Sequence, residues 1–120
     1  MTLLADVLIA VRSGKLNFSP ESDSEEALRE FQLPARALVY AEEEKLLGHL
    51  VAHKNALHGE LLYDLIVVVE GMTHRGEMFL AEPESQSQKE RQLEEILELR
   101  PNFMGLGINI RALWRKFFGK

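Results

Sequence analysis

Residues 44–80 read EKLLGHLVAHKNALHGELLYDLIVVVEGMTHRGEMFL and contain the most informative structural signals of the chain. HLVAH at 49–53 has the composition of a short, half-buried strand, and LLYDLIVVV at 61–69 is rich in the β-branched and aromatic residues that strands favour. KNALHGE at 54–60 lies between them, contains Gly59, and is typical of a hairpin connection. The pattern predicts a β-hairpin.

A short helix is expected directly after the hairpin. Glu70 and Gly71 close the second strand, and Thr73 is suited to cap the helix HRGEMFLAE at 74–82, because its hydroxyl can accept an unbonded N–H of the first turn. Pro83 stops this helix, since proline lacks the N–H that the next turn needs.

The first segment of the chain predicts an amphipathic helix that ends near Gly14. A loop at 15–23 follows, with at most a short extended piece between Leu16 and Phe18, because Pro20 and its polar neighbours disfavour more. The apolar positions of the helix recur at spacings of three and four: Leu3, Leu4, Val7, Leu8 and Val11.

Two more helices are predicted before the hairpin. A short one follows two overlapping capping boxes and buries Ala27, Leu28 and Phe31. A third starts with Pro34 in its first turn and ends at Gly48. The capping-box pairs are Ser22 with Glu25 and Asp23 with Glu26, and the apolar positions of the third helix are Ala37, Leu38, Ala41 and Leu46.

The region after the short closing helix predicts two further helices. QSQKERQLEEILELR at 86–100 is charged, with a modest apolar stripe, and Pro101 ends it. PNFMGLGIN at 101–109 forms a link, and Asn109 caps a last helix. The apolar side of that last helix holds Ile110, Leu113, Trp114 and Phe117.

Two local patterns carry a resemblance to the winged helix-turn-helix superfamily, whose chain order is a helix pair followed directly by a hairpin. EKLLGHLV at 44–51 is similar to the point where a recognition helix ends and the first wing strand begins. MTHRGEMFL at 72–80 resembles the apolar-Thr-x-x-Gly-x-x-Phe-Leu ending of many small bacterial winged-helix proteins of unassigned function. The resemblance covers residues 24–82, with the helix at 3–12 as support.

The resemblance implies an α+β fold, a winged helix-turn-helix with a two-stranded wing and two added C-terminal helices. Residues 1–82 would form the winged-helix domain, and residues 83–120 a helical extension of the same globular unit. In that ending Gly76 would let the short helix approach the wing, while Phe79 and Leu80 fill the core beneath it.

The resemblance also implies double-stranded DNA as a partner, with a recognition helix at 34–47 and a wing at 54–59. The candidate DNA-contacting residues are Arg36, Tyr40, Lys45, Lys54, Asn55 and His58. Glu42, Glu43 and Glu44 oppose this, as does the net charge of −5, because both repel phosphates. The leading hypothesis is a non-enzymatic DNA-binding regulator, and the rival is a protein-interaction module of the same shape that does not bind nucleic acid.

The last helix interleaves cations with large apolar side chains. It can pack on its own domain or on a second copy, lie in a membrane interface, or bind nucleic-acid phosphates. Packing is the commonest fate of such side chains, and a homodimer is expected. The candidate partner or dimer residues are Arg111, Trp114, Arg115, Phe117 and Phe118.

Residues that could support a metal site or catalysis are sparse. His49, His53 and His58 are the one cluster that could hold a metal, but scattered histidines on a wing surface are commoner than ligands, and no metal or cofactor is predicted. GLG at 105–107 lacks the context of a dinucleotide-binding loop. No pattern resembles a catalytic constellation, so an enzyme is not expected.

Composition is that of one ordinary domain. The chain has 120 residues, of which 46% are hydrophobic and 28% charged, enough for one core under a normal polar surface. It has no cysteine, which excludes disulfides and thiolate sites, and no run near the ~20 apolar residues that span a bilayer. We therefore expect a cytoplasmic protein that does not associate with membranes.

Overall fold

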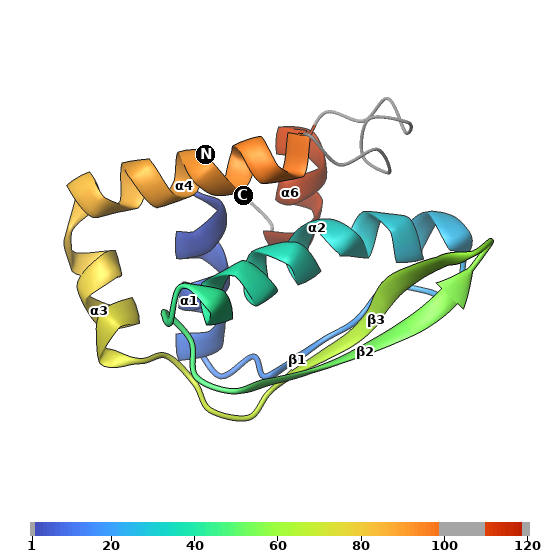
Figure 1. Ribbon diagram of the computed structural model, residues 1–120, viewed down its shortest axis with the longest axis horizontal. Helices are drawn as coiled ribbons and strands as arrows, with labels where there is room; N and C mark the ends of the chain where they lie inside the picture. Colours follow the sequence, from blue (N-terminus) through green and yellow to red (C-terminus); the bar gives the residue numbers. More distant parts are fainter. Residues whose placement is uncertain (1, 99–109, 119–120) are drawn as a thin grey trace.

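The computed structural model describes residues 2–98 and 110–118. It confirms the predicted α+β class: in these residues five helices accompany a three-stranded antiparallel sheet (Figure 1). The predicted link at 101–109 and its Asn109 cap lie outside the described residues. The elements are α1 (Leu3–Arg12), β1 (Asn17–Phe18), α2 (Glu25–Glu43), β2 (Leu50–Leu57), β3 (Glu60–Val68), α3 (His74–Ala81), α4 (Pro83–Glu98) and α6 (Ile110–Phe118).

The sheet has the strand order β1-β3-β2, so that β3 is central and β2 forms one edge. The short extended piece expected near Phe18 is confirmed as β1, whose Phe18 pairs with Ile66 of β3. The predicted seven-residue hairpin connection is wrong, because β2 continues to Leu57 and only two residues turn the chain. Both turn residues, His58 (φ 50°) and Gly59 (φ 83°), have the positive φ that a two-residue hairpin turn requires.

The predicted break at Pro34 is also wrong, since α2 is one continuous helix with this proline inside it. Its N-cap is Ser24, whose hydroxyl accepts the Ala27 N–H at 3.1 Å, in place of the predicted Ser22 or Asp23. Proline removes one helical hydrogen bond. The helix persists because every side chain around the proline, from Glu30 to Ala41, is buried or half-buried by tertiary packing.

Helix α2 ends earlier than predicted, at Glu43 and not at Gly48, and Lys45 lies just beyond its C-cap Glu44. Lys45 has a φ of 62°, and the N–H of the next residue, Leu46, bonds back to the carbonyl of Ala41 at 2.8 Å. This is the hydrogen bond that closes a helix after a left-handed residue. Gly48 is needed for another reason. A side chain there would clash with Glu70, because its Cβ would lie 2.6 Å from the Cβ of Glu70.

The predicted cap of the closing helix is confirmed. The hydroxyl of Thr73 accepts the Gly76 N–H at 3.0 Å and donates to the carbonyl of Lys45 at 2.6 Å, so that it ties the start of α3 to the end of α2. A Cβ at Gly76 would lie 2.3 Å from the carbonyl oxygen of Leu46. The glycine therefore permits close approach to the end of α2, and not to the wing as predicted.

Helix α2 lies at the centre of the fold, along the sheet on one side and against helices on the other (Figure 1). Helix α4 contacts α1, α2 and α3, and α6 contacts α2, so both C-terminal helices cover the side of α2 that is turned away from the sheet. The largest fully buried side chains of the core include Leu3, Leu4, Leu8, Phe31, Leu33, Leu38, Leu46, Leu47, Ile66, Leu93 and Leu97.

Candidate interaction surface

The segment that was expected to contact DNA exposes few of its side chains. Arg36 lies over the ring of Tyr63, with 5.3 Å between its guanidinium carbon and the ring centroid. The Tyr40 hydroxyl donates to Gln92 of α4 at 2.9 Å. Burial, with the charges of Glu44 and Glu43, raises the pKa of Tyr40. Of the candidates at 34–47, Lys45 alone is exposed.

The acidic run that argued against DNA binding is largely engaged in holding the fold. The Glu42 carboxylate accepts the Leu50 N–H at 2.8 Å and lies 3.9 Å from His49. The Glu44 carboxylate pairs with Lys89 of α4. Two of the three carboxylates therefore fix the start of β2 and the docking of α4, and Glu43 remains as the exposed member.

The wing candidates lie on the hairpin, and each has a neighbour there. The Lys54 ammonium sits over the Tyr63 ring, 4.9 Å from its centroid. The Asn55 side chain accepts the Ala56 N–H at 3.0 Å. His58, in the turn, lies 2.8 Å from the Glu25 carboxylate. Lys54 and, from α2, Arg36 therefore both contact the ring of Tyr63, while His58 is paired with a carboxylate.

The three histidines are not brought together. His49, His53 and His58 each face a different carboxylate, and the closest pair joins His53 Nδ1 to Asp64 at 2.6 Å. Within residues 2–98 and 110–118, no three or more histidine, aspartate or glutamate side chains are grouped so that they could hold a metal ion.

The C-terminal aromatic helix packs on its own domain. The Trp114 side chain is 4% exposed, its indole N–H donates to the Asp6 carboxylate at 2.7 Å, and its ring stacks on Phe118 with centroids 4.5 Å apart. Phe117 and Phe118 are half-buried and Arg115 is exposed, while the side chain of Arg111 lies outside the described residues. The aromatic group that was a candidate for partner contact is therefore used inside the fold.

Exposed apolar side chains gather instead on the sheet. Val51 faces Val67 across the two strands, and His53 faces Leu65, so these positions share one face because side chains alternate along a strand. Val69 follows directly after β3, and its N–H bonds the carbonyl of His49 at 2.9 Å. No described helix covers this face in Figure 1. Val51 is 50%, Leu65 38% and Val69 58% exposed. We call Val51, Leu65, Val67 and Val69 the open sheet patch.

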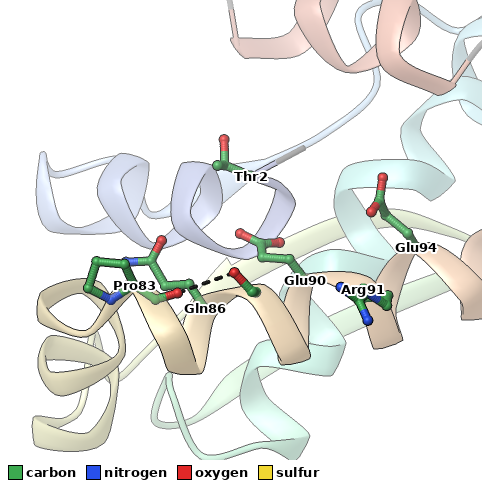
Figure 2. Close-up of a pocket in the computed structure, with 7 residues that line it drawn as sticks. Thr2, Pro83, Gln86, Glu90, Arg91 and Glu94 are labelled. Atoms are coloured by element: carbon green, nitrogen blue, oxygen red, sulfur yellow. Dashed lines mark hydrogen bonds between the residues drawn. The ribbon is translucent and has the colours of Figure 1, made fainter.

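A second feature, which no sequence pattern above indicated, is a buried carboxylate on α4. Glu90 of α4 is 5% exposed and lines a pocket of about 380 Å³ beside Thr2 (Figure 2). Its carboxylate accepts the N–H groups of Leu4 at 2.7 Å and Ala5 at 3.0 Å. Burial is the main reason that the pKa of Glu90 rises to about 7. The spacing from Glu90 to Leu93 and Leu97 places it on the apolar stripe of the helix, which is the signal that could have identified it.

Comparisons with protein-family models, curated proteins and solved structures found no match. The geometry of the chain is therefore the basis for a functional proposal.

Proposed function

We propose that this chain is a non-enzymatic protein-interaction module with winged-helix topology, and that the open sheet patch is its contact surface. The chain order supports the topology: helix α2 is followed directly by the β2–β3 hairpin, and the short helix α3 follows the hairpin. The departure from it is the fusion of the expected helix pair into α2.

The buried position of α2 argues against DNA as the principal ligand. A helix that reads the major groove presents a row of exposed polar side chains to base edges. From Glu30 to Glu42 no side chain of α2 is exposed. Groove insertion would require this helix to leave the core.

The observation that carries the proposal is the distribution of exposed apolar surface. In the described residues eight large hydrophobic side chains are exposed, and five of them belong to the sheet or its immediate flanks. An apolar centre with a polar rim is the usual make-up of a protein contact, and here His53 and Asp64 supply part of that rim. The five are Leu16, Val51, Leu61, Leu65 and Val69.

The proposal is tested by a photo-crosslinking amino acid placed at Leu65 in cells that naturally contain the protein. Position 96 is the matched control, because Ile96 of α4 is also 38% exposed. A discrete protein adduct from position 65, absent from position 96 and abolished by Val51→Asp, is expected. Equal adducts from both positions, or none from position 65, would refute the open sheet patch as a contact surface.

DNA binding through the hairpin is the second candidate. It is favoured by the engagement of Glu42 and Glu44 within the fold, which removes part of the electrostatic objection. A titration with mixed-sequence duplex DNA over a salt series decides between the two. Micromolar binding that weakens steeply with salt and is reduced by Lys54→Ala would establish DNA binding, and no binding at low salt would exclude it.

A further inference from the structure

The outer edge of β2 is a hydrogen-bonding surface that the described sheet leaves unused. β2 is the last strand in the order β1-β3-β2, so one side of its main chain pairs with β3 and the other faces no further strand of that sheet (Figure 1). In an antiparallel pair, alternate residues direct their N–H and C=O groups toward the neighbouring strand. An edge of this kind can pair with another strand unless it is blocked.

Two side-chain contacts show which main-chain groups of β2 face outward. The Leu50 N–H donates to the Glu42 carboxylate at 2.8 Å, and the Ala56 N–H donates to the Asn55 side chain at 3.0 Å. Both N–H groups are therefore bonded away from β3, and they lie an even number of positions apart, so the even-numbered residues of β2 face the free edge. The same contacts block this edge at its two ends.

Ala52 and Lys54 are the outward residues that remain between the blocked ends. The alternation runs through both, because the bulge at this point places its extra residue, Asp64, in β3 and leaves β2 regular. In the described residues no side chain caps the N–H of Ala52 or Lys54, as Glu42 and Asn55 cap the ends. The open part of the edge is therefore short and centred on His53.

We propose that the chain forms a two-fold homodimer, in which β2 pairs antiparallel with β2 of a second copy about an axis at His53. This axis places Ala52 of each copy opposite Lys54 of the other. Both pairs join outward residues, so each pair can exchange two hydrogen bonds. The open part of the edge is thus complementary to itself, which favours a second copy over a foreign strand.

The charges along β2 are compatible with this pairing. The strand contains no acidic residue, and its one lysine, Lys54, would face the small and uncharged Ala52. His53 would lie beside His53 of the second copy. Each imidazole keeps a carboxylate beside it, because His53 Nδ1 lies 2.6 Å from Asp64 of its own chain. The axis therefore brings no unopposed charges together.

Other axes along β2 are less favourable. An axis between two residues would set outward groups opposite inward ones, so that the hydrogen bonds could not form. An axis at Lys54 would set this lysine directly opposite its own copy, and like charges in that position are destabilising. An axis at Ala52 would pair Lys54 with Leu50, whose N–H is already bonded to Glu42.

The dimer would join the two sheets into one continuous sheet. A two-fold axis perpendicular to the sheet keeps its faces, so the open sheet patches of both copies would lie on one side. The pairing uses the edge of β2 and leaves those patches uncovered, so it does not depend on the proposed function.

Disulfide mapping on the purified full chain tests the pairing, because the natural chain has no cysteine. His53→Cys places two thiols opposite each other at a pair that is not hydrogen-bonded between the copies. The Cα atoms of such a pair are about 4.5 Å apart, within the range of disulfides. A covalent dimer should form rapidly under mild oxidation. Val51→Cys is the matched control, since its Cα would lie more than about 10 Å from its own copy.

A mixture of Val51→Cys and Asn55→Cys tests the register separately, because these two positions face each other across the proposed axis. The mixture should yield a covalent heterodimer, while neither variant forms a covalent dimer alone. This result decides the question if circular dichroism shows that His53→Cys does not fold. Covalent dimers that form equally fast in all samples, or in none, would overturn the proposal.

Sedimentation equilibrium measures the dimer without a covalent bond. Ala52→Glu sets a carboxylate opposite Lys54 in both pairs and should lower the dissociation constant roughly five-fold, whereas Ala52→Lys should raise it by a similar factor. Ala56→Glu and Ala56→Lys make the same changes in net charge outside these pairs and should have little effect. A wild type that stays monomeric at the highest concentration, or equal effects at both positions, would refute the dimer. No other protein is present, so such a failure leaves the test at Leu65 unaffected.

Discussion

The α2–β3 and α1–α4 junctions are built in the same way and differ in charge. In each, one buried side chain of a helix bonds the main chain of another element. At the α2–β3 junction Gln32 accepts the Tyr63 N–H at 2.9 Å and donates to the Tyr63 carbonyl at 2.8 Å. At the α1–α4 junction the Glu90 carboxylate accepts two N–H groups.

The comparison shows how the choice of amide or carboxylate sets the response to pH. An amide matches one N–H and one C=O without a charge, so the α2–β3 junction is indifferent to pH. A carboxylate matches two N–H groups but carries a charge whose burial has a cost, so the α1–α4 junction is stable to a degree that depends on pH.

Gln32→Glu should convert the pH-insensitive junction into a pH-sensitive one. The Gln32 side chain is fully buried, and an ionised glutamate would face the Tyr63 and Leu28 carbonyls without a proton to donate. We expect a loss of about 3–5 kcal/mol in the free energy of unfolding at pH 8, with partial recovery at pH 5, measured by urea denaturation. A uniform loss at both pH values would show that the charge is not the cause.

Gln32→Leu should break the same junction without adding charge. It leaves the Tyr63 N–H and C=O buried without their partner, which costs about 2–4 kcal/mol at all pH values. Urea denaturation at pH 5 and pH 8 measures the loss. Gln88→Leu, at an exposed position of α4, is the control and should change stability by less than about 0.5 kcal/mol.

Glu90→Gln should remove the pH dependence of the α1–α4 junction. Because the folded pKa of Glu90 is raised to about 7, its contribution to stability is fully present below the unfolded pKa and is lost as the pH rises through 7. Between pH 5 and pH 8 the wild type should lose about 2 kcal/mol more than Glu90→Gln in urea denaturation. Equal losses would mean that Glu90 is not the titrating group.

Tyr40→Phe should have the smallest effect, because it removes a hydrogen bond between partly exposed side chains of α2 and α4. The hydroxyl donates to Gln92 at 2.9 Å, and water can replace this bond. Thermal denaturation should show a loss of about 0.5–1 kcal/mol. A loss near that of Gln32→Leu would contradict the view that main-chain bonding by a buried side chain is what makes a junction strong.

The predictions from sequence succeeded where the signal is local. Thr73 and the glycine three residues later defined a capped helix, since both groups of the cap belong to one turn. The spacing of apolar residues in α1 and the β-branched run of β3 defined their elements in the same way. Gly14, with a φ of 107°, lies just past the end of α1, as predicted.

The failures have physical causes that the local sequence does not contain. Pro34 normally ends or begins a helix, but the packing of the buried and half-buried side chains around it outweighs one lost hydrogen bond. His58 adopts a left-handed conformation that few non-glycine residues favour. The turn is therefore confined to His58 and Gly59, whereas the sequence predicted a connection over 54–60. Lys45 also adopts a left-handed conformation, just beyond the end of α2, so that the helix stops before the predicted Gly48.

The local sequence was enough to predict the α+β class, the Thr73 cap of α3 and the identity of most elements, because these depend on residues a few positions apart. Tertiary structure alone decided the continuity of α2, the burial of Trp114 against Asp6, and the position of Glu90 at the start of α1. Glu90 and Leu4 are 86 residues apart along the chain. Pairings of this kind depend on which surfaces the packed helices bring together, and on the dielectric of the interior that results.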